Sequence, residues 1–167
     1  MTNDDAFLQR AYELARLGAE AGEVPVGALV VEVHSRKIIA EAHNAPIALS
    51  DPTAHAEILA LRQAASIANN YRLFDYDLFV SLEPCAMCAG AIANARIRRV
   101  VFSAPDTKGG AVINGVRFFD QPTCHWHPEI EQGSFQSENA KLLQEFFRAR
   151  RQSRKAPQII GDSSQSE

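Results

Sequence analysis

Apolar residues near both ends of the chain recur at intervals of three and four, which is the spacing of one face of a helix. The first stripe ends at Gly22, a residue suited to a helix terminus, and predicts a helix over residues 4–21. The second stripe predicts a final helix over residues 137–154, with at least one of its two phenylalanines in the core. The stripes are Phe7, Leu8, Ala11, Leu14, Ala15 and Leu17, and then Leu142, Leu143, Phe146 and Phe147.

Between these helices, short apolar and β-branched runs predict strands. The first two flank the polar turn His34-Ser35-Arg36 and should pair as a hairpin. The stretch 111–135 has mixed polarity and no clear period, so we assign no element there. The predicted strands are residues 26–33, 37–42, 77–82 and 98–103.

Two further helices are predicted in the middle of the chain. Asp51 is a suitable N-cap with Pro52 at the first helical position, so a helix should run from there to residue 68 with His55 in its opening turns. A second helix should follow Pro84 over residues 85–95. The order of elements indicates a three-layer α-β-α sandwich, a mixed sheet with helices on both faces. Both middle helices should begin at the same sheet edge.

The composition is that of a soluble globular protein of one domain, residues 1–155. Its 167 residues are 46% hydrophobic and 22% charged, and no apolar run reaches the ~20 residues of a membrane span. The acidic N-terminus is unlike a signal peptide. Three cysteines, two of them in C-x-x-C, favour metal binding in a reducing compartment and therefore a cytoplasmic location. The Ser- and Gln-rich stretch 156–167 is expected to be a disordered tail.

The net charge of −3 does not suggest a nucleic-acid-binding protein, but the basic residues are unevenly distributed along the chain. Basic residues gather at the end of the final helix. They could form a solvated helix end that complements the helix dipole, or they could contact phosphates. The sequence by itself leaves both possibilities open. These residues are Arg148, Arg150, Arg151, Arg154 and Lys155.

Candidate chemistry lies at the starts of the two middle helices. His55, Cys85 and Cys88 can supply one imidazole and two thiolates to a zinc ion, which leaves the fourth tetrahedral position for water. Glu57 is two residues from His55 and suits a proton-transferring base better than a further ligand. Zinc lowers the pKa of bound water to about 7, so hydrolytic attack on C6 of adenine or C4 of cytosine is the implied reaction.

A closed structural zinc site is the alternative. It would need a fourth ligand from Cys124, His125 or His127, and it would leave Glu57 without a role. These three residues, like His34 and His43, are otherwise expected to be ordinary packing or surface residues.

H-x-E followed by P-C-x-x-C is already known as the signature of zinc-dependent nucleobase deaminases. Over residues 4–155 the sequence resembles the bacterial tRNA-specific adenosine deaminases of the cytidine deaminase-like superfamily. The signature alone indicates the superfamily, and the other matches narrow it to the tRNA enzymes. The matching segments are Pro25-Val26-Gly27-Ala28, His43-Asn44, residues 51–58 (DPTAHAEI), 82–91 (LEPCAMCAGA), 104–111 (APDTKGGA) and 142–148 (LLQEFFR).

The resemblance implies a central five-stranded mixed sheet, one Zn²⁺ per subunit of a homodimer, and conversion of adenosine to inosine at wobble position 34 of a tRNA anticodon. His55, Cys85 and Cys88 would be the zinc ligands and Glu57 the proton shuttle. The tRNA anticodon stem-loop would be bound by six residues: Asn44, Asp106, Lys108, Arg148, Arg150 and Arg151. Pro105 stands where relatives often carry a basic residue, and we assign it no contact.

Alternatives remain at this point. Asn44 could instead cap a loop. The chain could be a deaminase of a free base or nucleoside, of the guanine or cytidine type, with the same metal site. It could also be a non-catalytic, zinc-stabilised RNA-binding protein.

Overall fold

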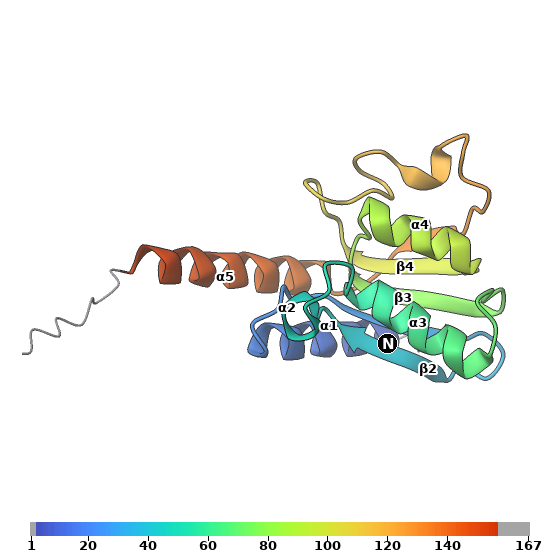
Figure 1. The fold of residues 1–167 in the computed structure, drawn as a ribbon, viewed down its shortest axis with the longest axis horizontal. Helices are drawn as coiled ribbons and strands as arrows, with labels where there is room; N and C mark the ends of the chain where they lie inside the picture. Colours follow the sequence, from blue (N-terminus) through green and yellow to red (C-terminus); the bar gives the residue numbers. More distant parts are fainter. Residues whose placement is uncertain (1–2, 157–167) are drawn as a thin grey trace, which may run out of the picture.

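A five-stranded mixed sheet forms the centre of the computed structural model, which describes residues 3–156 (Figure 1). The strand order is β2-β1-β3-β4-β5. β1 is antiparallel to β2 and β3, whereas β3, β4 and β5 are parallel. The elements in chain order are α1 (Asn3–Glu20), β1 (Gly27–Glu32), β2 (Ile38–His43), α2 (Pro46–Leu49), α3 (Ala56–Ala68), β3 (Tyr76–Leu82), α4 (Ala86–Ala95), β4 (Arg99–Ala104), the 3₁₀ turn η1 (Phe118–Asp120), β5 (Glu129–Gln132) and α5 (Gln136–Lys155).

Helices cover both faces of the sheet, so the predicted three-layer sandwich is confirmed. α1 and the start of α5 pack on one face, and α3 and α4 pack on the other. Alternate residues of each central strand serve the two layers: Leu78 and Val80 belong to the larger apolar cluster under α3 and α4, whereas Phe79 belongs to the smaller cluster under α1. Among the described residues, no helix combines the length and apolarity of a membrane span.

The hairpin and the strand positions agree with the prediction to within about two residues. The fifth strand lies within the unassigned stretch 111–135. All four residues of β5 are exposed, and it pairs only with β4 as a short edge strand. It therefore has no buried face that would have produced an apolar pattern. Only Ala156 of the expected tail 156–167 lies within the described residues.

The predicted start of α3 is wrong. The helix begins at Ala56 with His55 as its N-cap residue, not near Asp51. The side chain of Asp51 instead accepts hydrogen bonds from the backbone N–H and the hydroxyl of Thr53, both at 2.8 Å. An aspartate that closes a turn on the residue two positions later has the same local sequence pattern as a helix cap. The short helix α2 just before it was also missed.

The final helix was predicted correctly in extent but not in burial. Its C-terminal half projects from the body of the molecule (Figure 1). Phe147 is 38% exposed, and neither Phe146 nor Phe147 belongs to either apolar cluster. The expectation that at least one of them is in the core is wrong, because this half of α5 runs beyond the surface that the sheet offers for packing.

Candidate active site

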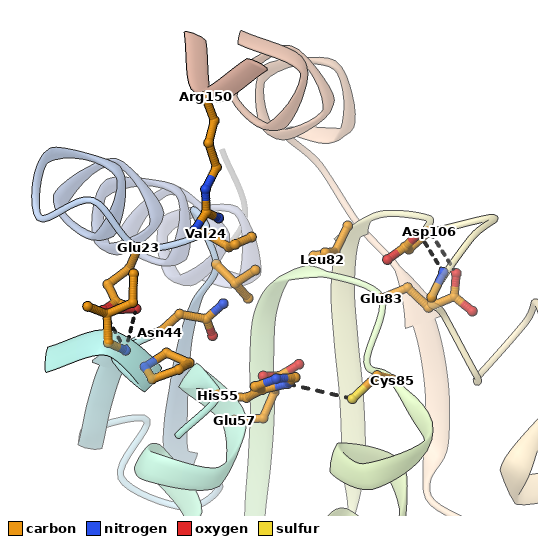
Figure 2. A pocket seen from close by; sticks show the side chains of 14 residues that line it. Glu23, Val24, Asn44, His55, Glu57, Leu82, Glu83, Cys85, Asp106 and Arg150 are labelled. Atoms are coloured by element: carbon orange, nitrogen blue, oxygen red, sulfur yellow. Dashed lines mark hydrogen bonds between the residues drawn. The ribbon is translucent and has the colours of Figure 1, made fainter. Parts of the chain in front are cut away.

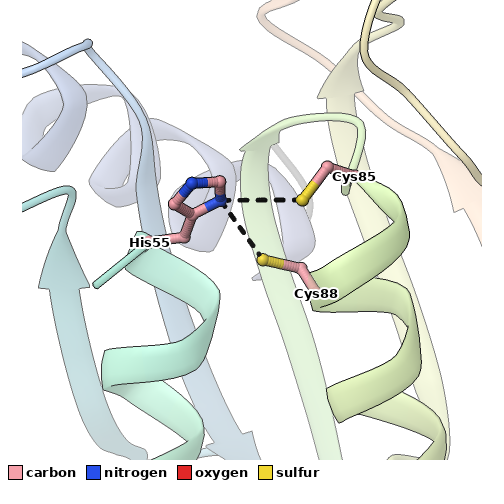
Figure 3. Close-up of side chains that lie close together, drawn as sticks. All are labelled: His55, Cys85 and Cys88. Atoms are coloured by element: carbon pink, nitrogen blue, oxygen red, sulfur yellow. Dashed lines mark hydrogen bonds between the residues drawn. The ribbon is translucent and has the colours of Figure 1, made fainter. Parts of the chain in front are cut away.

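His55, Cys85 and Cys88 converge at the edge of the sheet where α3 and α4 begin (Figure 3). Nδ1 of His55 lies 3.6 Å from Sγ of Cys85 and 3.5 Å from Sγ of Cys88. The three ligand atoms all lie within 4.8 Å of one another. Histidine nitrogen and cysteine sulfur are ligands for a transition-metal ion. The predicted ligand set is therefore brought together by the fold.

Local backbone geometry aims these ligands. His55 and Cys85 are the N-cap residues of α3 and α4 and both have extended conformations, with ψ of 153° and 174°. An extended N-cap directs its side chain outward from the helix start, while Cys88 follows in the first turn of α4 and is fully buried. The N–H groups and dipole of a helix start also favour negative charge on these sulfurs.

The electrostatics of the two thiols differ. A hydrogen bond from Cys88, helped by one from His55 and opposed by burial, lowers the pKa of Cys85 to about 4. The same hydrogen bond to Cys85, together with burial, raises the pKa of Cys88. The hydrogen bond with Cys85 raises the pKa of His55. The lowered pKa of Cys85 favours its thiolate, which is the form in which cysteine binds a metal ion.

Glu57 is the second residue of α3, beside the cluster, and is 4% exposed. Burial raises the pKa of its carboxyl to about 7, and the nearby charge of Cys85 adds to the rise. A carboxyl group with a pKa near neutrality can both accept and donate a proton. This is the property required of a group that takes a proton from water and later returns it.

A pocket of about 430 Å³ opens over this cluster (Figure 2). That volume is within the range of small-molecule sites. Its walls come from the segment before β1, from α2, from the start of α3, from the end of β3 and from the loop after β4. The predicted site residues that line it are Asn44, His55, Glu57, Cys85, Asp106 and Arg150.

The other predicted RNA contacts lie in an adjoining pocket of about 710 Å³ between α5 and the loop after β4. Lys108, Arg148 and Arg151 line this second pocket, and Asp106 lines both pockets. Arg150 points from α5 toward the first pocket (Figure 2). The three arginines predicted to bind RNA are thus divided between two neighbouring pockets, which one sequence pattern could not show.

Asn44 is buried and caps α3 from another segment. Its Oδ1 accepts a hydrogen bond of 2.8 Å from the backbone N–H of Ala56. A backbone N–H can only donate, so this contact fixes the orientation of the amide and leaves Nδ2 to donate elsewhere. The predicted alternatives, a capping residue and a pocket residue, are therefore not exclusive.

Two buried carboxylates at this site were missed by the sequence analysis. Glu23 accepts hydrogen bonds from the N–H groups of Ile47 and Ala48 and so holds α2 against the pocket. Glu83 accepts hydrogen bonds from the loop after β4. Each bonds backbone groups more than twenty positions away. The only signal in the sequence was an acidic residue next to an apolar strand.

Cys124, His125 and His127 do not join the cluster. Within residues 3–156 the only group of ligand-type side chains close enough to share a metal ion is His55, Cys85 and Cys88. The thiol of Cys124 donates to the carbonyl of Trp126, and His127 contacts the carbonyl of Phe119. The closed structural site with a fourth protein ligand therefore has no support in the geometry.

The fold and this site define a deaminase. A family model described as MafB19-like deaminase matches residues 2–151 of the chain. A solved structure from a study of A-to-I editing by tRNA:A34 deaminases at the wobble position of transfer RNA superposes with a TM-score of 0.80 at 47% identity. It covers 83% of this chain and 99% of that one.

Curated relatives are similar along almost their whole length. The tRNA-specific adenosine deaminase of Agrobacterium fabrum is 48% identical over 145 residues, which are 87% of this chain and 94% of the relative. That of Haemophilus influenzae is 45% identical over 157 residues, which are 94% of this chain and 90% of the relative. The chain belongs to the family of the tRNA-specific adenosine deaminases.

Proposed function

We propose that this protein is a zinc-dependent hydrolase that converts adenosine to inosine at wobble position 34 of a tRNA anticodon and releases ammonia. The observation that carries the proposal is the convergence of His55, Cys85 and Cys88 beside the buried carboxyl of Glu57 at the base of one pocket. The family narrows the substrate to adenosine in tRNA.

Zinc fits the donor set. Zn–S bonds of about 2.3 Å and Zn–N bonds of about 2.0 Å at tetrahedral angles separate sulfur from nitrogen by roughly 3.5 Å. The measured separations are 3.6 and 3.5 Å. Three protein ligands also match a catalytic rather than a structural zinc site, which is normally closed by a fourth. When bound, zinc supplies a water molecule of lowered pKa and polarises the group that is attacked.

Glu57 carries the protons in this proposal. The overall reaction adds one water to the amidine carbon C6 and removes ammonia. Glu57 accepts a proton from the water, donates it to N1 of the ring, and then helps to protonate the departing amino group. Its burial keeps bulk water from competing for these protons, and its pKa of about 7 suits both directions of transfer.

The remaining residues bind the RNA. Nδ2 of Asn44 donates to an acceptor nitrogen of the purine, while its Oδ1 stays on the N–H of Ala56. Asp106 and Lys108 contact the nucleotides next to the target base. Arg148, Arg150 and Arg151 bind phosphates of the stem-loop. An unpaired anticodon base can enter the pocket at a lower unstacking cost than a base in a duplex.

The working unit in this proposal is a cytoplasmic homodimer with one zinc per subunit, as the resemblance to the tRNA enzymes implies. Sedimentation of the purified protein tests the number of subunits, and metal analysis tests the number of zinc ions per subunit.

The decisive experiment is incubation of the purified protein with an anticodon stem-loop that carries A34, followed by mass analysis of the nucleosides. Inosine at position 34 is the expected product. A Glu57→Ala variant that binds zinc and RNA but forms no inosine would also set aside a non-catalytic RNA-binding role. Unchanged turnover by that variant would contradict the mechanism.

Deamination of a free base is the second candidate. The fold is also similar to a guanine deaminase structure from Nitrosomonas europaea, with a TM-score of 0.73 at 25% identity, and to one from Bacillus subtilis, with 0.59 at 32%. Both identities are well below the 47% of the tRNA:A34 deaminase structure. Turnover of guanine that rivals turnover of the stem-loop would favour this candidate.

A further inference from the structure

Glu83 is a buried carboxylate that the deamination mechanism does not use. It is 2% exposed and lies between the end of β3 and the metal-binding start of α4. Its Oε1 accepts hydrogen bonds from three consecutive backbone N–H groups, those of Val112, Ile113 and Asn114, at 3.1, 2.9 and 2.9 Å. Its Oε2 accepts from the N–H of Asp106 and from Nδ2 of Asn114, both at 2.8 Å.

All five donors belong to the loop that follows β4. Within the described residues, no lysine or arginine forms an ion pair with Glu83, so N–H groups alone compensate its buried charge. A buried carboxylate without such donors would be costly, and the loop would be left with unsatisfied N–H groups if the carboxylate were absent. The carboxylate and the loop conformation therefore require each other.

The loop is packed closely against this carboxylate. A Cβ atom added to Gly110 would lie 2.5 Å from Cδ of Glu83 and 2.4 Å from the carbonyl oxygen of Asp106. Only glycine allows the backbone to approach this near. The backbone of Gly110 also donates to the same carbonyl of Asp106 at 2.9 Å, which closes the turn.

This arrangement fixes the position of Asp106. Glu83 accepts a hydrogen bond from the N–H of Asp106. Oδ1 of Asp106 in turn accepts hydrogen bonds from the N–H groups of Lys108 and Gly109, each at 3.0 Å. Asp106 lines both the pocket over the metal cluster and the adjoining pocket beneath α5. Figure 2 shows Glu83 beside Asp106, with the hydrogen bond from the N–H of Asp106 to Oε2 of Glu83 drawn as a dashed line.

Glu83 does not act as a further metal ligand. It is two residues from Cys85, yet its oxygens are not part of the group of ligand atoms formed by His55, Cys85 and Cys88. The carboxylate is hydrogen-bonded to the loop, whereas Sγ of Cys85 lies 3.6 Å from Nδ1 of His55. The same short segment thus aims a ligand in one direction and anchors the loop in the other.

We propose that Glu83 is a positioning residue for RNA binding: through the N–H of Asp106 it fixes the 105–114 loop to the start of α4, so that Asp106 stands at the junction of the two pockets. This role rests on the proposed function, because the RNA strand is what the junction receives. Loss of the anchor should weaken binding of the stem-loop and leave the chemical step largely intact.

Glu83→Gln is the sharpest variant. A glutamine keeps one acceptor oxygen, which can serve the three N–H groups now bonded to Oε1, but its NH₂ replaces Oε2. The side chain of Asn114 can turn to accept from that NH₂, whereas the backbone N–H of Asp106 can only donate. The change therefore releases the loop at Asp106 and retains the contacts at residues 112–114. Glu129→Gln, an exposed glutamate at the opposite end of the sheet, is the matched control.

Four quantities should be measured on both zinc-loaded variants: kcat and KM for the stem-loop, zinc content, and the rate of amide exchange of Asp106 by NMR. For Glu83→Gln we expect KM to rise about tenfold with kcat changed less than about threefold, because binding rather than chemistry is affected. Zinc content should stay at the wild-type value, and exchange of the Asp106 amide should accelerate about tenfold. Glu129→Gln should match the wild type.

Gly110→Ala provides a second route to the same effect, should Glu83→Gln fail to fold. Its methyl group would push the loop away from the carboxylate without changing any charge. We expect the same rise in KM at similar kcat. The double variant should show less than the sum of the two effects, because both act through one contact.

The outcomes separate the two proposals. If the wild type forms no inosine, the proposed function fails, and the exchange measurement still reports whether Glu83 holds Asp106. If the wild type is active and KM is unchanged in Glu83→Gln and in Gly110→Ala, the role of Glu83 is overturned. A loss of zinc in either variant, or a fall in kcat with constant KM, would likewise overturn it and assign Glu83 to the metal site.

Discussion

Oδ1 of Asn44 accepts a hydrogen bond of 2.8 Å from the backbone N–H of Ala56, so a residue at the end of one segment caps the helix that carries Glu57. Glu57 follows Ala56 directly, and His55 precedes it. A single side chain therefore positions His55, the proposed metal ligand, and Glu57, the proposed proton-transferring residue, with one atom, and presents a donor to the pocket with another.

This double role predicts different outcomes for two substitutions of Asn44. Asn44→Ala leaves the N–H of Ala56 buried without an acceptor and should lower the free energy of unfolding by about 1–3 kcal/mol. Asn44→Asp keeps the capping oxygen and loses the donor, so stability should be closer to wild type while kcat/KM for the stem-loop falls at least about tenfold. Urea denaturation and steady-state kinetics measure the two effects. Equal stability of the two variants would contradict the capping role.

Glu57→Gln removes the titrating group and keeps the shape of the side chain. We expect kcat for inosine formation to fall by about 10²–10⁴, which is the usual range for loss of a general acid–base. Zinc content and stem-loop affinity should be unchanged. Single-turnover assays together with metal analysis check this. A variant with normal kcat would show that the protons take another route.

Metal binding should distinguish Cys88 from Cys124. Cys88→Ser replaces a ligand with a poorer one and should reduce bound zinc below one equivalent per chain. Cys124→Ser should retain full zinc, because its hydroxyl can donate to the carbonyl of Trp126 as the thiol does. Atomic absorption after dialysis against a chelator is the measurement. Zinc loss from Cys124→Ser would instead support a closed structural zinc site with Cys124 as the fourth ligand.

The basic residues of α5 should contribute to binding through charge. Replacing Arg150 and Arg151 with alanine should weaken stem-loop binding and lower the slope of log K against log salt by about 1 for each phosphate that the variant no longer binds. Arg16→Ala combined with Arg72→Ala, a change of the same net charge at exposed sites outside both pockets, is the control. An unchanged slope would identify the patch as a solvated helix end.

Stability should depend on pH through the contact between α1 and β2. Arg10 donates to both carboxylate oxygens of Glu41, at 3.0 and 2.6 Å, and this hydrogen bonding lowers the pKa of Glu41 in the folded state. A lowered folded-state pKa stabilises the protein above the ordinary pKa of about 4.5, and this stabilisation is lost as pH falls through the lower folded-state value.

Glu41→Gln should therefore reduce stability at pH 7 by no more than about 1 kcal/mol, because the pair is partly exposed, and should flatten the decline of Tm below pH 4.5. Melting curves between pH 3 and 7 provide the measurement. An identical decline of Tm in the variant would show that Glu41 does not contribute to this pH dependence.

The sequence by itself determined which elements form and which chemistry they carry. Apolar spacing identified four of the five strands and the long helices, because periodicity is a local consequence of burying one face. His55, Cys85 and Cys88 were recognisable as candidate ligands because their side-chain types suit zinc and each stands near a predicted helix start. The same signals failed for β5, which buries no face, and for Asp51, whose turn resembles a cap.

Tertiary structure decided how these parts serve one site. Asn44 caps a helix twelve residues away, and Glu83 anchors a loop about thirty residues further along the chain. The basic residues of α5 divide between two pockets because the folded chain brings α5 against both of them. Such contacts depend on which segments the sheet brings together. A hydrogen bond between distant residues leaves no periodic trace in the sequence, so only the folded chain reveals it.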